Sequence, residues 1–150
     1  MAAWIGDGNP AGASKRYFPT LDKADLHRQG YVANRSAHST GFAVDLTIVR
    51  RDAPTAPSPL AGSCNGPAAM RSAPDEIDMG TGFDCLDRLS HTASGGVTKE
   101  QHAARMLLVA AMRRRGFTNY AREWWHFTFH GGTRSEAYDF PIVPLGSKTP

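Results

Sequence analysis

Residues 36–47, "SAHSTGFAVDLT", lead into the clearest strand in the sequence. From Phe42 to Val49, large apolar side chains alternate with smaller or more polar ones, which is the period of a half-buried strand. Asp45 stands in the middle of this pattern, although strand interiors are depleted of aspartate and an unpaired buried carboxylate is unfavourable. The stretch therefore predicts a strand together with a partner that compensates Asp45.

A second strand is predicted over residues 123–129, "EWWHFTF". In each strand, alternation separates an apolar core face from a mixed face, and each mixed face carries one metal-competent residue, Asp45 or His126. The predicted core faces are Phe42, Val44, Leu46 and Ile48 in the first strand, and Trp125, Phe127 and Phe129 in the second. The tail segment 139–144, "DFPIVP", is predicted to add an edge segment.

The strongest helix signal is "TKEQHAARMLLVAAMRRRG", which begins at Thr98. Thr98 and Gln101 make a capping box, and Gly116 stops the helix. The predicted apolar face consists of Met106, Leu107, Val109, Ala110 and Ala111.

A shorter helix is predicted over residues 21–30, with Asp22 as its N-cap and Gly30 just past its end. Residues 50–76 are rich in proline and are predicted to form a long surface loop without helix or strand. The order strand, long loop, helix, strand predicts an α+β fold with a small antiparallel or mixed sheet and flanking helices. The 150 residues fit one domain, residues 1–150.

Composition excludes several classes of protein. The net charge of +3 is small, and the one dense basic run, "MRRR" at 112–115, closes the long helix, where cations suit the helix dipole. We therefore expect no nucleic-acid partner. No apolar run approaches the ~20 residues that span a bilayer, and the first residues do not form a signal peptide.

The two cysteines, Cys64 and Cys85, lie within and just after the proline-rich loop. Two cysteines without a CxxC spacing do not make a zinc ribbon. They are candidates for a disulfide that pins the loop, which would indicate an oxidising compartment. Two unrelated free thiols are the alternative.

His38 precedes Asp45 by seven positions, in the turn that enters the first strand. Together with His126 these residues offer three metal ligands and leave a fourth position open, as in catalytic zinc sites. Glu123 can face the same cavity as His126 only from a turn or bulge at the strand entry, where it would act as general base. Alternatively, Asp45 is a hydrogen-bonded structural residue, His126 a core histidine and Glu123 a surface carboxylate.

These motifs resemble a known family. "SAHSTGFAVD" matches the SxHxxGxAxD signature of the D-alanyl-D-alanine dipeptidases of the VanX type, and "EWWHF" matches their ExxH element. The resemblance extends over residues 17–141 and includes "GYVANRSAHS" (30–39), "DMGTGFDCLDRLSH" (78–91) and "YDFP" (138–141).

The resemblance implies one Zn²⁺ per chain, held by His38, Asp45 and His126, with Glu123 as the catalytic base. It implies that Ser36 and Asp84 lie around the free amino group of the substrate. The implied substrate is a small D,D-dipeptide such as D-alanyl-D-alanine. The implied fold is the small zinc peptidase fold shared with D-alanyl-D-alanine carboxypeptidases and hedgehog signalling domains.

The sequence departs from the family in two ways. It starts late, and it lacks the "GYRP"-like motif whose arginine stabilises the developing oxyanion, so we expect an N-terminal section to be missing. A carboxypeptidase for longer cell-wall peptides and an inactive zinc-binding remnant therefore stay open as alternatives. The long loop with Cys64 and Cys85 resembles exported relatives, which indicates a periplasmic or secreted protein, although cytoplasmic members also exist.

Overall fold

The computed structural model describes residues 16–53, 62–132 and 136–138. The predicted edge segment 139–144 lies outside these ranges. Helices and strands follow in the order α3 (Lys23–Arg28), 3-10 helix η1 (His38–Thr40), β1 (Ala43–Asp45), α4 (Ala68–Arg71), 3-10 helix η2 (Arg88–Ser90), α5 (Lys99–Arg113), β2 (Phe117–Asn119) and β3 (His126–Phe129).

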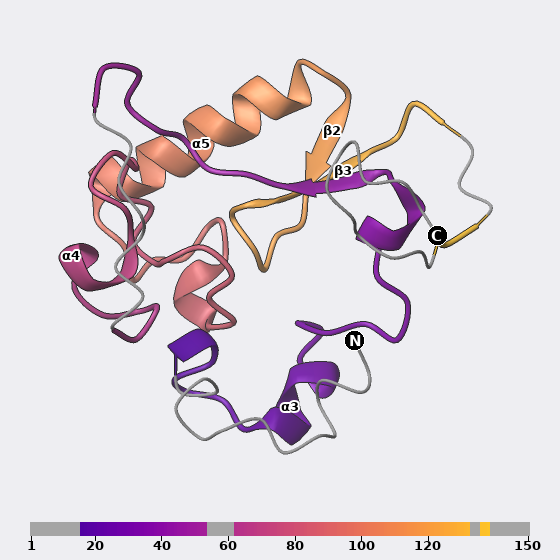
Figure 1. The fold of residues 1–150 in the computed structure, drawn as a ribbon, viewed down its shortest axis with the longest axis horizontal. Coiled ribbons are helices and arrows are strands. Elements are labelled where there is room, and N and C mark those ends of the chain that lie inside the picture. Colours follow the sequence, from indigo (N-terminus) through magenta and orange to yellow (C-terminus); the bar gives the residue numbers. More distant parts are fainter. Residues whose placement is uncertain (1–15, 54–61, 133–135, 139–150) are drawn as a thin grey trace, which may run out of the picture.

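The three strands form an antiparallel sheet in the order β1-β3-β2, which confirms the predicted α+β class. Figure 1 shows α5 along one side of this sheet and α3 on the other side of the molecule. The sequence did not predict β2, because three residues are too few to show an alternating pattern. Within the described ranges, no helix has the length and apolar character that a membrane crossing requires.

Both predicted strands are longer than the observed ones. β1 ends at Asp45 because its partner β3 begins only at His126. Beyond β1 the extended chain changes partner: after one hydrogen bond from Leu46 N to Trp125 O, it forms an isolated bridge between Val49 and Glu76. The single predicted strand is thus a short strand followed by a separate pairing with the end of the proline-rich loop.

Glu123, Trp124 and Trp125 form a turn rather than the start of β3. The Glu123 N–H donates to Tyr120 O and the His126 N–H donates to Glu123 O, which closes the chain back on itself. Strand alternation does not apply inside this turn, so both tryptophans are buried, with 1% exposure each. Trp124, which regular alternation would place away from the core face of Trp125, therefore belongs to the same core cluster.

The main core surrounds a disulfide between Cys64 and Cys85. Buried around it are Met79, Leu108, Trp124, Trp125 and Phe127. Leu46 and Ile48 pack against this cluster, as predicted, but Val44 is 39% exposed. The core packs against the residues that follow β1 rather than against β1 itself. The predicted core face is therefore wrong at Val44.

Helix α5 has the predicted capping box: the Gln101 N–H donates to Thr98 Oγ1, and the Thr98 N–H donates to Gln101 Oε1. Its predicted apolar face is wrong in large part, because Met106 and Leu107 are exposed. The helix instead buries the face of Leu108 and Arg105. Hydrophobic spacing missed this face because a fully buried arginine lies at its centre.

Arg105 is tolerated there because backbone carbonyls accept its hydrogens. Its Nε donates to Met79 O and its Nη1 to His91 O, both at 2.7 Å. The same guanidinium therefore anchors α5 to both ends of the segment between residues 79 and 91. Burial lowers the pKa of Arg105 to about 10, so the side chain stays charged at neutral pH.

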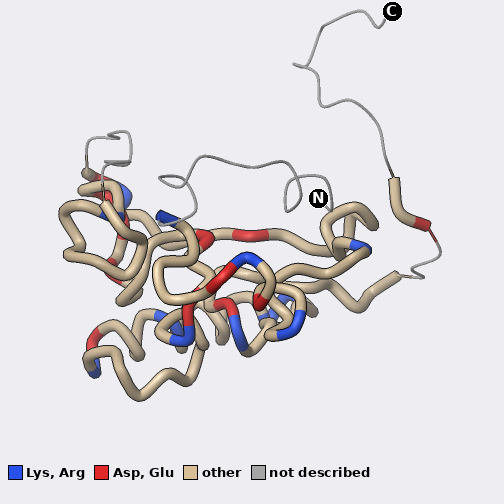
Figure 2. The backbone as a smooth tube through the Cα atoms, turned by 90° about the horizontal axis from the view of Figure 1, so that it is seen from below, with Lys and Arg blue, Asp and Glu red and all other residues tan. Residues whose placement is uncertain are grey.

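Two further predictions concern local structure. The short helix α3 follows Asp22, and Gly30 has a left-handed φ of 75° two residues after its end, as predicted. The proline-rich loop is not wholly irregular, because its residues 68–71 form α4. Acidic and basic residues are interspersed along the described chain (Figure 2).

Candidate metal centre

His38 opens the 3-10 helix η1, just before β1. Gly41 ends this helix with a left-handed φ of 71°, which turns the chain into the strand. The Ser36 Oγ accepts a hydrogen bond from the His38 N–H at 3.2 Å. The "SAHSTG" segment is thus a compact turn that brings the His38 ring over the start of the sheet.

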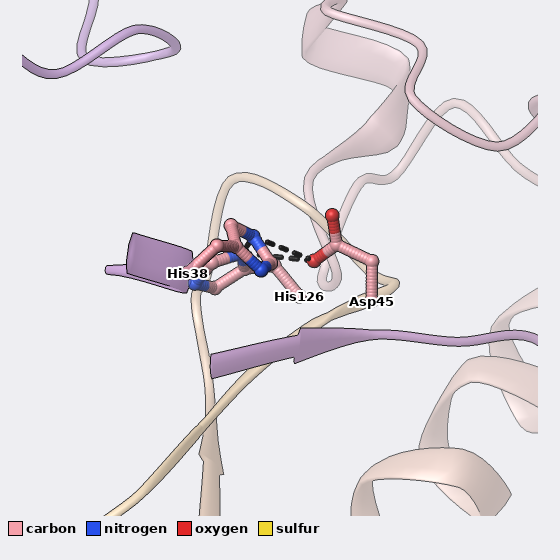
Figure 3. A group of neighbouring side chains, drawn as sticks. All are labelled: His38, Asp45 and His126. Carbon is pink, nitrogen blue, oxygen red and sulfur yellow. Dashed lines mark hydrogen bonds and ion pairs between the residues drawn. The ribbon is translucent and has the colours of Figure 1, made fainter. Parts of the chain in front are cut away.

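The pairing of β1 with β3 places Asp45 directly opposite His126. Asp45 Oδ1 lies 2.9 Å from His126 Nδ1 and 3.3 Å from His38 Nε2. The two ring nitrogens lie 3.1 Å apart. In Figure 3, dashed lines join one Asp45 carboxylate oxygen to both imidazole rings, which lie perpendicular to each other. Residues 88 positions apart therefore meet at one point.

These three atoms fit a tetrahedral metal ion. Ligand atoms bonded at about 2.0–2.1 Å in a tetrahedral site lie about 3.3 Å from one another. The observed separations of 2.9–3.3 Å are close to this value. Asp45 Oδ1 is buried and has no assigned hydrogen-bond partner, although one nitrogen of each ring lies within 3.3 Å of it. Two nitrogens and one oxygen thus converge on one point, and hydrogen bonds do not satisfy all three atoms. A cation bound between them would do so.

Glu123 lies beside this group, in the predicted turn at the entry to β3. Its Oε2 is 3.7 Å from His126 Nδ1, and only 8% of the residue is exposed. Burial raises the pKa of Glu123 to about 7, and the negative charges of Asp45 and Asp84 add to this rise. A carboxyl group with such a pKa can both accept and release a proton near neutral pH.

The site carries a surplus of negative charge. Burial alone would lower the pKa of His126, but the Asp45 carboxylate raises it above its ordinary value. Asp84 is affected by the same negative charge: burial and the charge of Asp45 raise the pKa of its carboxyl group. A divalent cation between the ligand atoms would neutralise part of this charge.

A cavity of about 760 Å³ opens onto the metal-competent group. The predicted residues Ser36, Asp84 and Glu123 line it, together with the three candidate ligands. Among the described residues, Asp84 alone has a positive φ outside glycine, at 57°. Backbone strain of this kind collects at functional sites. Its neighbours Phe83 and Cys85 pack into the core, so the strained backbone directs Asp84 to the cavity.

Tyr120 and Asn119 are among the residues of the cavity wall that sequence reasoning missed. The Tyr120 ring lies edge-on to the His126 ring, with centroids 5.9 Å apart, and the Tyr120 hydroxyl donates to Gly30 O at 2.7 Å. Asn119, at the end of β2, also lines the cavity. The only signal for either residue was its place within four residues of Glu123.

A family model described as "D-ala-D-ala dipeptidase" matches residues 67–143, about half of the chain. The chain belongs to this family. The dipeptidase match includes Asp84, Glu123 and His126, whereas His38 and Asp45 precede it. The case for those two ligands therefore depends on the geometry of the site.

Curated relatives of this dipeptidase family agree over a longer span. The D-alanyl-D-alanine dipeptidase of Enterococcus faecium is 32% identical over 84% of this chain and 53% of its own length. That of Streptomyces coelicolor is 32% identical over 93% of this chain and 60% of its own length. That of Escherichia coli is 34% identical over 72% of this chain and 42% of its own length. The chain thus spans about half the length of the curated relatives it matches.

Proposed function

We propose that this chain carries a zinc-dependent centre that hydrolyses D-alanyl-D-alanine or a similar D,D-dipeptide. The observation that carries the proposal is the convergence of His38, Asp45 and His126 beside a buried Glu123 in one cavity. The names of the relatives supply the substrate class.

Two imidazole nitrogens, one carboxylate oxygen and an open fourth position are a donor set of catalytic zinc in hydrolases. We assign one ion per chain to His38 Nε2, Asp45 Oδ1 and His126 Nδ1. When bound, zinc supplies Lewis acidity, which lowers the pKa of water and polarises a carbonyl group. Its charge would also lower the pKa of Glu123 from about 7 and favour the carboxylate form.

Glu123 is assigned the proton transfers. As a carboxylate it accepts a proton from the attacking water while the water oxygen bonds to the scissile carbonyl carbon. It then donates this proton to the amine nitrogen as the C–N bond breaks, so it ends as a carboxylate again. The fixed turn and the burial of Glu123 support this role, because general acid–base catalysis needs a positioned group with a pKa near the working pH.

Asp84 and Ser36 are assigned to the free amino group of the substrate. The Asp84 carboxylate lines the cavity, and a charge-assisted hydrogen bond to an ammonium would offset the burial that raises its pKa. A blocked amine offers no such charge. A centre of this kind therefore prefers free dipeptides, whereas a carboxypeptidase accepts longer, N-blocked peptides.

The test compares hydrolysis of D-alanyl-D-alanine with that of its N-acetyl form by the zinc-loaded chain. We expect the free dipeptide to be preferred, and Glu123→Gln to lower kcat by about 10²–10⁴ with zinc still bound. Preference for the blocked peptide would identify a carboxypeptidase. Zinc binding without turnover of either peptide would identify an inactive zinc-binding protein.

We also propose that the chain works in an oxidising compartment, the periplasm or the outside of the cell. The support is the disulfide between Cys64 and Cys85, since such bonds persist mainly in exported proteins. A thiol count on protein isolated under alkylating conditions tests this. Two free thiols in the native host would place the chain in a reducing compartment.

A further inference from the structure

The side chain of Asn119 lies against the turn that joins β2 to β3 and carries Glu123. Its Nδ2 is 2.9 Å from Glu123 O and 3.0 Å from His126 O. A longer contact of 3.5 Å reaches Trp124 O. One amide group therefore bonds to the backbone of the candidate base and to that of a candidate ligand.

The orientation of this amide follows from its partners. The three carbonyl oxygens can only accept, so the NH₂ group must face them. On its other side, Asn119 Oδ1 accepts a hydrogen bond from Thr92 Oγ1 at 2.5 Å. Thr92 is 7% exposed, and its N–H donates to Ala121 O in the same turn. The buried Thr92 and the half-buried Asn119 thus form a brace, which we call the Asn119 brace.

We propose that Asn119 is a positioning residue that sets Glu123 and His126 at their working separation. Glu123 Oε2 and His126 Nδ1 lie 3.7 Å apart, which is close enough for an ion pair but too far for a hydrogen bond that would fix their geometry. Their backbones, in contrast, share the Asn119 amide. The backbone role stands on these contacts, and its consequence for catalysis rests on the proposed function.

Aspartate would keep the shape of Asn119 but would place a carboxylate oxygen, which can only accept, where asparagine has its NH₂ group. This oxygen would face three carbonyl oxygens, which reverses the attraction. The other bonds of the turn would remain, namely Glu123 N to Tyr120 O and His126 N to Glu123 O. Asn119→Asp is therefore expected to loosen the turn without removing any other side chain.

Amide hydrogen exchange on the full-length chain tests the brace directly. In Asn119→Asp we expect the Glu123 and His126 amides to exchange at least about 10-fold faster, while the amides of α5 keep their rates. In the zinc-loaded variant, kcat and zinc affinity should each fall by about 10–100-fold, the range for groups that orient metal ligands. The KM for D-alanyl-D-alanine should change less than kcat.

Two further variants guard against a loss of folding. Thr98→Ala removes the distant cap of α5 and should lower Tm without faster exchange in the turn. Thr92→Val removes the hydroxyl that orients the amide and should cause a smaller change in the direction of Asn119→Asp. If Asn119→Asp does not fold, Thr92→Val decides the proposal in its place.

Unchanged exchange at Glu123 and His126 in Asn119→Asp would overturn the proposal, even if the wild-type chain hydrolyses the dipeptide. If the wild-type chain binds no zinc and shows no turnover, but the Glu123 and His126 amides exchange faster in Asn119→Asp, the brace is supported. Only the proposed function is then contradicted. The two failures are therefore distinguishable.

Discussion

Asp45 presents one carboxylate oxygen to two histidine rings at 2.9 and 3.3 Å, from a strand whose neighbouring positions are apolar. Such a carboxylate is unfavourable unless a positive charge compensates it. An imidazole supplies that charge only when it is protonated, whereas a bound cation supplies it at any pH, so an ion at this point would stabilise the local fold.

Removing a candidate ligand should therefore remove the metal. We expect His38→Ala and Asp45→Asn each to weaken zinc binding by more than about 100-fold, since even outer groups that orient ligands contribute about 10–100-fold. Zinc content by elemental analysis and competition with a chelator measure this. His102→Ala, a matched histidine change on α5, should keep full zinc content. Wild-type zinc content in both ligand variants would contradict the assignment.

Single residues drew attention to Asp45 and His126, because each is polar in an apolar run, and the structure brings both together with His38. Asp45 is a charged residue between Val44 and Leu46, and His126 follows two tryptophans. Arg105 was not predictable as a core residue, because its burial depends on carbonyl oxygens of Met79 and His91 that only the fold brings near.

Between elements, Asp78 joins α4 to α5. Its Oδ1 accepts hydrogen bonds from Arg71 and from the Gly80 N–H, and its Oδ2 accepts one from Gln101. Burial opposes ionisation of this carboxyl group, yet these hydrogen bonds hold its pKa below the ordinary value. The carboxylate thus fixes the start of the segment that leads to Asp84.

A lowered pKa in the folded state adds stability above the pKa of the unfolded chain, and this stability is lost as the pH falls through the folded pKa. Asp78→Asn should therefore lower the free energy of unfolding by about 1 kcal/mol at neutral pH, a small effect because the side chain is partly exposed. Urea unfolding at several pH values should show the difference shrinking below about pH 4. A constant difference down to the lowest pH would contradict this role of the charge.

The element boundaries were less predictable than the elements themselves. Thr98 and Gln101 mark the start of α5 correctly, because a capping box is a local signal. The turn at Glu123, in contrast, interrupts an aromatic run that reads as a strand throughout. The hydrogen bonds that make it a turn, including the tertiary bond from Trp124 N to Ser90 O, form only in the folded chain.

Across the whole molecule, the disulfide links the proline-rich loop to the segment that carries Asp84. Cys64 and Cys85 are 21 positions apart, and both are buried in the main core. Sequence left free thiols open as the alternative, because the distance between two cysteines depends on the complete fold. In the folded chain, Gly82 N also bonds to Cys64 O, so the loop and the Asp84 segment are joined twice.

Reduction should therefore destabilise the chain and loosen one wall of the cavity. For a loop of this length we expect a loss of about 3 kcal/mol in the free energy of unfolding, because the unfolded chain regains conformational freedom. Denaturant unfolding with and without a reductant measures this, and the doubly substituted Cys64→Ala, Cys85→Ala protein should match the reduced wild type. Because Asp84 directly precedes Cys85, the KM for D-alanyl-D-alanine should rise on reduction while zinc content stays constant. Loss of zinc instead would show that the disulfide supports the ligands rather than the substrate wall.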